Sequence, residues 1–71
     1  MVVGAKQLRK ALSAGKAKEV FLAEDADPAI TGPIADLCHQ NHVLCTWVSD
    51  MSELGRACGI DVGAAAAALV A

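Results

Sequence analysis

The sequence predicts a small α/β domain in which short strands alternate with helices. The first observation is an amphipathic helical pattern that begins at Ala5 and ends before Gly15. The second is a pair of apolar runs rich in β-formers, Val20–Ala23 and Val43–Val48, each followed by a helical stretch. With a short apolar start at Met1–Val3, they predict the order β-α-β-α-β-α-β, which is typical of layered α/β proteins. The 71 residues are enough for one domain only. Because a chain this short buries only about 60% of its unfolded surface, we do not expect a large enclosed active site.

The first predicted helix has an apolar face and a basic face. With about 3.6 residues per turn, the apolar face collects Ala5, Leu8, Ala11 and Leu12. The opposite face carries Lys6, Arg9, Lys10 and Ser13, with Gln7 at its edge. We expect Gly15 to end this helix as its C′ glycine. The apolar run Val20–Ala23, bounded by charged residues, is expected to be a strand buried on both faces.

The middle of the sequence predicts a second helix and a second strand. Asp27 before Pro28 is typical of a helix start, because Asp caps helix N-termini and Pro favours the first helical position. Gly32 and Pro33 interrupt the helical pattern, so we expect the main helix to run from about Pro33 to Asn41. Its expected core face holds Ile34, Leu37 and Cys38. Val43–Val48 is expected to be a second buried strand.

The last third predicts a short helix and a closing strand. Asp50 and Glu53 have the spacing of a capping box, and Gly59 is expected to end the helix that follows. The residues expected to face inward are Leu54, Ala57 and Cys58. The alanines after Gly63 favour helix by local propensity, but eight residues are too few for a stable free helix. The alternation of elements predicts a final strand there instead.

The charges are distributed unevenly along the chain. The sequence has six Lys and Arg and eight Asp and Glu, which gives a net charge of −2. This net charge argues against a nucleic-acid partner, since nucleic-acid-binding domains are usually basic. The first 18 residues, however, carry five cations and no acid, whereas residues 19–71 carry a net −7. This split is itself an indication of an anionic partner for the basic part.

Composition also disfavours several classes of protein. No apolar run reaches the roughly 18 residues of a membrane span, and no signal-peptide pattern opens the sequence, so we expect a cytoplasmic protein. Cys38, Cys45 and Cys58 fit no disulfide framework and are expected to be free thiols. Cys38 and Cys45, with His39 and His42, do not form a convergent zinc set. Because no nucleophile or phosphate loop accompanies the acidic residues, we expect no metal, no cofactor and no catalysis.

Three stretches together resemble a known protein family. They are GAKQLRKAL (Gly4–Leu12), EVFLAEDADP (Glu19–Pro28) and LGRACGIDVGAAAAALV (Leu54–Val70). In order and spacing they resemble the ribosomal-protein family of kink-turn RNA binders, which includes the large-subunit proteins called seven-Ae and thirty-e and small bacterial relatives. The resemblance covers essentially the whole chain. It implies a three-layer α-β-α sandwich around a mixed four-stranded sheet.

Members of that family commonly begin with a helix that precedes the strand of Met1–Val3. This sequence lacks such a helix. We therefore expect one face of the sheet to be partly uncovered, or covered by a protein partner.

The resemblance implies RNA contacts from the start of the first helix. The family pattern Gly-x-Asn-Glu-x-x-Lys reads here as Gly4-Ala5-Lys6-Gln7-Leu8-Arg9-Lys10. Lys-Gln in place of Asn-Glu looks like the bacterial branch. By this resemblance the helix N-terminus after Gly4 binds phosphate, and Lys6, Gln7 and Lys10 contact sheared G·A pairs.

The second element that the resemblance implies is the loop Ile60-Asp61-Val62-Gly63. Archaeal members carry an apolar residue and then Ser-Arg-Pro at this place. Ile60 matches and is expected to pack on an extruded nucleotide or on the stem. Arg-Pro is absent, and Asp61 repels phosphate unless it serves a hydrogen bond. Asp27, which the resemblance places near the flipped-out base, and Arg56 are further candidates.

Each candidate also has an ordinary structural explanation. The basic helix face can be a solvated surface, Asp27 only an N-cap, Ile60 and Val62 core or loop residues, and Arg56 a solvated helix residue. The predicted function is a non-catalytic protein that binds a kink-turn in a structured RNA, such as ribosomal RNA or an mRNA leader. The alternative is a protein-interaction member of the same fold that uses an exposed apolar sheet face.

Overall fold

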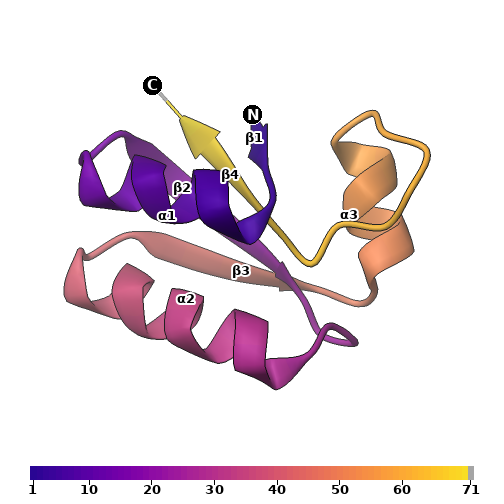
Figure 1. Cartoon of the computed structure of the whole chain (residues 1–71), viewed down its shortest axis with the longest axis horizontal. Helices are drawn as coiled ribbons and strands as arrows, with labels where there is room; N and C mark the ends of the chain where they lie inside the picture. The colour runs from indigo at the N-terminus through magenta and orange to yellow at the C-terminus, as the bar shows by residue number, and fades with distance from the viewer. Residues whose placement is uncertain (71) are drawn as a thin grey trace.

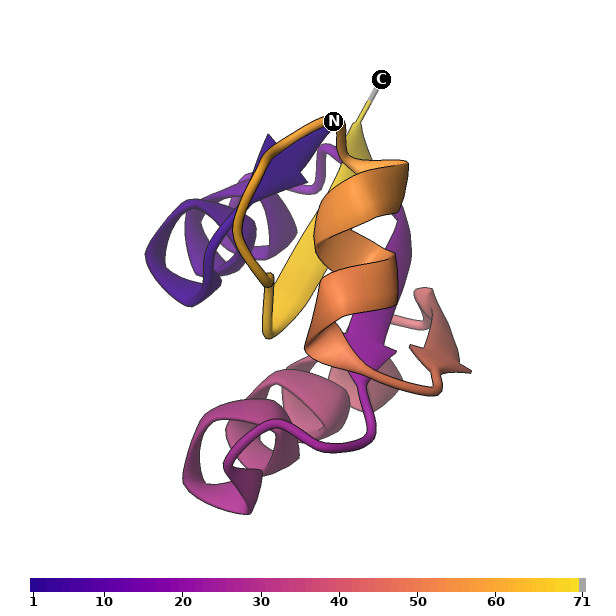
Figure 2. The ribbon, with the colours of Figure 1, turned by 90° about the vertical axis from the view of Figure 1, so that its right-hand side faces the viewer.

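The computed structural model describes residues 1–70 and has the predicted alternation of strands and helices. The elements are β1 (Val2–Val3), α1 (Ala5–Ser13), β2 (Ala17–Ala23), α2 (Pro28–Gln40), β3 (Leu44–Val48), α3 (Met51–Ala57) and β4 (Ala66–Val70). α1 and α2 pack on one face of the sheet and α3 on the other, which confirms the three-layer architecture (Figures 1 and 2). None of these helices is long and apolar enough to cross a bilayer.

The sheet is mixed, with the strand order β1-β4-β2-β3. β4 runs antiparallel to both β1 and β2, while β2 and β3 are parallel. The alanine run therefore forms the expected final strand, with Ala67 opposite Phe21 and Ala68 opposite Val20. A position between two strands outweighs the helix propensity of alanine, and its small side chains leave room for helices on both faces. Ala71, at the end of that predicted strand, lies outside the described residues.

The core divides into two clusters, one on each face of the sheet. Beneath α1 and α2 lie the fully buried residues Leu8, Leu12, Val20, Leu22, Ile34, Cys38, Ala66 and Ala68. Beneath α3 lie Ala23, Ala26, Leu54, Ala64 and Ala67. The predicted inward face of α1 is confirmed, and Gly15 ends that helix with a φ of 70°.

The predicted helix from Pro33 to Asn41 is wrong in its start. α2 begins at Pro28, where the Asp27 Oδ1 accepts a hydrogen bond of 2.9 Å from the Ala29 N–H, and it continues through Pro33 to Gln40. Pro33 cannot donate to the carbonyl of Ala29, but both residues are exposed and water can reach that carbonyl. One lost hydrogen bond on the wet side of a capped helix does not break it.

Two other expectations need correction. β3 is an edge strand, so Val43–Val48 is not buried on both faces; Leu44 is 64% exposed and Trp47 is also exposed. An apolar run does not distinguish a central strand from an edge strand, because only the sheet order decides which faces and edges are covered. In α3, Ala57 is exposed, and Gly55 is buried beside Leu54 instead.

The sheet face that carries α3 is only partly covered, as expected. Leu44 of β3 and Leu69 of β4 both pair with Glu19 of β2, so they share its face. The short helix α3 covers the opposite end of this face, and Leu44 and Leu69 remain 64% and 42% exposed. The described residues therefore leave an apolar strip on the surface of the sheet.

Candidate nucleic-acid interface

The predicted RNA-binding elements meet at one end of the sheet. β1, β2 and β3 all run antiparallel to the direction of β4, so their carboxyl ends lie beside the start of β4. Gly4 follows β1, Asp27 follows β2, and the loop of residues 60–63 precedes β4. The Gly4 N–H donates a hydrogen bond of 3.0 Å to the carbonyl of Ala66, which ties the start of α1 to the start of β4. Figure 1 shows these two segments side by side. Ligands commonly bind beyond the carboxyl ends of strands in α/β proteins.

Gly4 makes the sharp turn from β1 into α1. Its φ of 101° and ψ of 144° lie in a region that L side chains rarely adopt. Its carbonyl accepts the first helical hydrogen bond, from the Leu8 N–H at 3.0 Å. Because glycine has no side chain to cap the helix, the N–H groups of the first turn lack a side-chain acceptor.

The N-termini of the other two described helices are engaged by carboxylates. Asp27 caps α2, and Asp50 Oδ1 accepts from the Glu53 N–H at 2.7 Å at the start of α3. Asp25 Oδ1 accepts from the Met51 N–H at 2.8 Å at the same end of α3. Among the helices of residues 1–70, α1 is thus the one whose positive dipole end carries no acidic cap.

The polar side chains on the first turns of α1 point to different flanks. Lys6 lines a groove on the flank that faces α2, and Gln7 lines a hollow on the other flank, beside Val2. Lys10 borders both, so it lies on the crest of the helix between them. All three are exposed, and no other element covers them.

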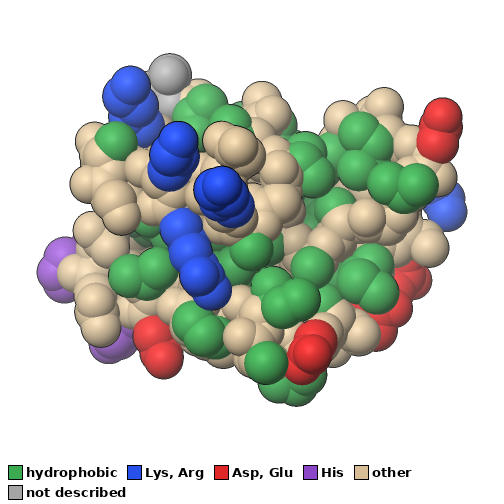
Figure 3. Space-filling model, viewed as in Figure 1, with side chains coloured by type: hydrophobic (Ala, Val, Ile, Leu, Met, Phe, Trp, Pro, Cys, Tyr) green, Lys and Arg blue, Asp and Glu red, His purple; other side chains and the backbone are tan. Residues whose placement is uncertain are grey.

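Most of the basic side chains gather over one part of the surface (Figure 3). Figure 3 shows most of the Lys and Arg side chains over α1 and the chain just after it, while the acidic side chains follow the margins. The sequence split between a basic start and an acidic remainder therefore becomes a spatial separation. Such a separation orients a polyanion toward α1.

The loop of residues 60–63 is held against α3. The Ile60 N–H donates to the Gly55 carbonyl at 3.0 Å, and the Ala64 N–H donates to the Met51 carbonyl at 3.0 Å. Between these two bonds the side chains of Ile60 and Val62 are exposed, Val62 by 70%. The explanation of these two residues as core is therefore wrong, and they are surface apolar residues on a fixed loop.

Arg56 lies next to this loop. It is exposed in the last turn of α3 and lines a hollow of about 350 Å³ together with Ser52 and the loop residues Ile60, Asp61 and Val62. The structure thus groups Arg56 with the loop and Lys6, Gln7 and Lys10 with α1. Asp61 places a carboxylate in the same hollow, and it opposes phosphate binding at that position.

Asp27 serves as the N-cap that its position predicted, and its side chain is exposed. Its neighbour Asp25 has a role that the sequence did not reveal, because its hydrogen bond to Met51 joins residues 26 positions apart. The residues Glu24–Asp27 have the same sequence whether the turn is merely solvated or hydrogen-bonds to the start of α3. No local signal distinguishes the two cases.

The cysteines offer no reactive thiol in the core. All three are free, as expected, and Cys38 is buried beside Cys45. Burial, with a smaller contribution from Cys45, raises the pKa of the Cys38 thiol to about 11, and burial also raises the pKa of Cys45. Both thiols are therefore protonated and unreactive near neutral pH. Across residues 1–70, no three His, Cys, Asp or Glu residues gather as metal ligands.

Residues 1–71 match the model of the Ribosomal protein L7Ae/L30e/S12e/Gadd45 family. The chain belongs to this family. The sequence resemblance to this family implied a mixed four-stranded sheet, and the structure of this chain has that sheet.

Several bacterial proteins are similar over nearly the whole chain. An RNA-binding protein of Geobacillus sp. (strain WCH70) is 49% identical over 69 residues, which span 97% of this chain and 84% of that protein. The RNA-binding protein YbxF of Geobacillus stearothermophilus is 44% identical over 70 residues, 99% of this chain and 85% of that protein. Among solved structures, the Giardia lamblia 15.5kD RNA binding protein matches with a TM-score of 0.90 and 31% identity. That match covers 97% of this chain and 58% of the other.

Proposed function

We propose that this protein binds RNA and recognises a kink-turn with the end of the sheet where α1 begins. The observation that carries the proposal is the uncapped N-terminus of α1, flanked by Lys6, Gln7 and Lys10. Free backbone N–H groups and nearby cations favour phosphate, and Gln7 adds both a donor and an acceptor for base edges. Membership of the family and relatives described as RNA-binding proteins support it.

The start of α1 and three of its side chains each have a role in this proposal. The first-turn N–H groups hold a phosphate where the RNA backbone bends. Lys6 and Gln7 project to opposite flanks of the helix, so a helix end inserted into a groove presents them to its two walls. There they contact the edges of sheared G·A pairs, while Lys10 on the crest reaches the groove floor or a phosphate.

The loop of residues 60–63 supplies the second half of the interface. Ile60 and Val62 are exposed on a loop that two backbone hydrogen bonds hold in place, and they cap the bulged nucleotides by apolar contact. Arg56 lies close enough to this loop to neutralise a phosphate. The proposal includes no reaction. The protein acts in the cytoplasm as part of a ribonucleoprotein, on ribosomal RNA or an mRNA leader.

A direct binding test uses one kink-turn RNA and a copy whose G·A pairs are replaced by Watson–Crick pairs. We expect the intact kink-turn to bind at least about tenfold more tightly, because only it presents the base edges that Lys6 and Gln7 contact. If three to five phosphates are contacted, log K falls with log salt with a slope of roughly −0.9 per contact. Equal binding of both RNAs, or binding that does not change with salt, contradicts the proposal.

A charge-reversal pair makes the test specific to α1. Replacing Lys6 and Lys10 by Glu is expected to abolish the preference for the kink-turn. Lys16→Glu with Lys18→Glu is the matched control, since it makes the same change in net charge at exposed positions beyond the helix. Loss of the preference in both double variants alike would indicate a general charge effect and would count against the proposed contacts.

A second candidate function is protein interaction through the apolar strip on the sheet. The exposure of Leu44 and Leu69 favours it. A variant with Lys6→Glu and Lys10→Glu that loses the kink-turn but still retains a protein partner would support this second function alongside the first. The two surfaces lie on different elements, so their variants separate the two functions.

A further inference from the structure

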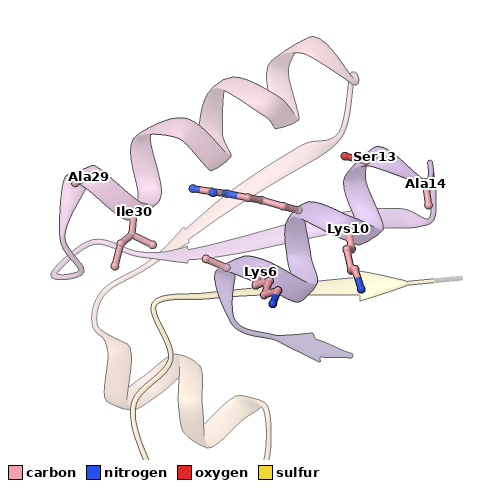
Figure 4. Close-up of a pocket in the computed structure, with 8 residues that line it drawn as sticks. Lys6, Lys10, Ser13, Ala14, Ala29 and Ile30 are labelled. Atoms are coloured by element: carbon pink, nitrogen blue, oxygen red, sulfur yellow. The ribbon is translucent and has the colours of Figure 1, made fainter.

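A groove runs between α1 and α2, on the flank of α1 away from Gln7. It has a volume of about 850 Å³ and is lined by Ala5, Lys6, Arg9, Lys10, Ser13 and Ala14 of α1 and by Ala29 and Ile30 of α2. Figure 4 shows Ile30 and Ala29 at the start of α2, opposite the helix that carries Lys6, Lys10 and Ser13. Three of the lining residues are cations, and no lining residue is acidic.

We infer that this groove holds a single-stranded segment of the same RNA, continuing from the phosphate at the N-terminus of α1 toward Ser13. The inference rests on the proposed function, because Lys6 and Lys10 belong to both surfaces. It adds Arg9, Ser13 and Ile30 to the interface.

The charge of the groove selects a polyanion. Lys6 and Arg9 lie about one turn apart along α1, so they meet successive phosphates of a chain that follows the helix. With no carboxylate among the lining residues, nothing in the groove offsets this positive potential. The nine residues of α1 give the path a length of about 13 Å.

The apolar floor selects a single strand over a duplex. Ile30 is 37% exposed and lines the groove from α2 together with Ala29, while Ala5 lines it from α1. A duplex keeps its base faces stacked and offers only base edges in its grooves, so no base face reaches such a floor. An unstacked base does reach it and is covered by Ile30 on one side and by the planar guanidinium of Arg9 on the other.

The test compares a blunt-ended kink-turn RNA with tailed copies of the same RNA. The reference RNA has blunt stems. Each tailed RNA carries a short single-stranded uridine tail on one of the stem ends. We expect the wild-type protein to bind one tailed RNA about tenfold more tightly than the blunt RNA. The salt dependence of that RNA is expected to be steeper by roughly 0.7 in log–log slope for each added phosphate contact.

Two variants remove the groove contacts, and one serves as the control. Arg9→Gln and Ile30→Ser change exposed residues, so both are expected to fold, which circular dichroism verifies. Each is expected to reduce the advantage of the tailed RNA at least about threefold, since each removes one face of the base contact. Lys18 lies on β2, outside the groove. Lys18→Gln removes one positive charge, as Arg9→Gln does, and is expected to retain the tighter binding of the tailed RNA.

The outcomes separate this inference from the proposed function. If the wild-type protein binds tailed and blunt RNA equally, the groove does not hold RNA, while kink-turn recognition stands. If Arg9→Gln weakens both RNAs equally and more than Lys18→Gln, Arg9 belongs to the kink-turn surface and the inference is wrong. If neither RNA binds, both the proposed function and this inference fail. Photo-crosslinking of a 4-thiouridine tail to Ile30 or a neighbouring groove residue would support the inference directly.

Discussion

The backbone carbonyl of Val62 lies where a side chain on Gly55 would have to be. A Cβ built on Gly55 overlaps that oxygen and comes within 3.2 Å of the Gly63 Cα. The Ile60 N–H donates to the Gly55 carbonyl at 3.0 Å, so this residue of α3 holds the loop in two ways. The position of the apolar loop residues thus depends on the absence of one methyl group.

Gly55→Ala is expected to displace this loop. The added methyl cannot be accommodated by a side-chain rotation, because its neighbour is backbone, and we expect a loss of stability of about 2 kcal/mol. Kink-turn affinity is expected to fall with it, since Ile60 and Val62 move. Denaturant unfolding measures the first effect, and a gel shift measures the second.

Gly32→Ala is the matched control for this prediction. Gly32 lies in the middle of α2 with open space around a built Cβ and without a positive φ. We expect it to stabilise the protein by about 0.5–1 kcal/mol, because alanine is the better helix former. A Gly55→Ala protein as stable as this control, with unchanged chemical shifts at residues 60–63, would show that the loop is not set by Gly55.

Asp27 gives a prediction that separates its two interpretations. Asp27→Asn keeps a good N-cap, so stability is expected to stay within about 0.5 kcal/mol, whereas Asp27→Ala is expected to cost about 1 kcal/mol. If the carboxylate is only a cap, its removal in Asp27→Asn relieves repulsion and tightens RNA binding roughly twofold at low salt. Isothermal titration with kink-turn RNA measures this. Weaker binding by Asp27→Asn would instead mean that the carboxylate contacts the RNA.

Most elements that sequence reasoning predicted correctly are set by local patterns, whereas the final strand β4 was predicted from the alternation of elements, against the helix propensity of its alanines. The apolar and basic faces of α1, the glycine at its end and the Asp caps of α2 and α3 depend on residues within a turn or two. The resemblance placed Gly4, Lys6, Gln7 and Lys10 together because they lie on one helix. These positions need no knowledge of the sheet.

The errors arose where distant contacts decide. Pro33 is tolerated because its side of α2 faces water, and β3 is exposed because no strand of residues 1–70 pairs with its outer edge. The bond from Asp25 to α3 and the groove beside Arg9 each join elements far apart in the chain. Composition and periodicity do not encode such distances, so only the folded arrangement reveals them.

We expect the apolar strip on the sheet, formed by Leu44 and Leu69, to make no contribution to RNA binding. Leu44→Lys with Leu69→Lys is expected to leave kink-turn affinity within about twofold after the change in net charge is matched, because both residues are exposed and remote from α1's first turn. Lys substitutions at Gln40 and Ser49, which are also exposed and line neither the groove nor the hollow beside Arg56, provide the charge-matched control. Sedimentation of the wild-type protein measures whether the strip self-associates. A strict monomer argues against a second copy at this face, whereas a large loss of RNA affinity in the leucine variant alone would place the strip within the RNA interface.

The buried thiol of Cys38 is expected to make the free energy of unfolding fall at alkaline pH. Its pKa is raised to about 11 from a usual value near 9, so the folded state holds this proton more tightly than the unfolded state does. The resulting stabilisation is fully present below pH 9 and is lost as the pH rises toward 11, a difference of roughly 2–3 kcal/mol. Cys45, whose pKa burial also raises, adds in the same direction. Denaturant unfolding between pH 8 and 11 is expected to show a shallower decline for Cys38→Ala than for wild type or for Cys58→Ala, and parallel curves for all three would contradict this account.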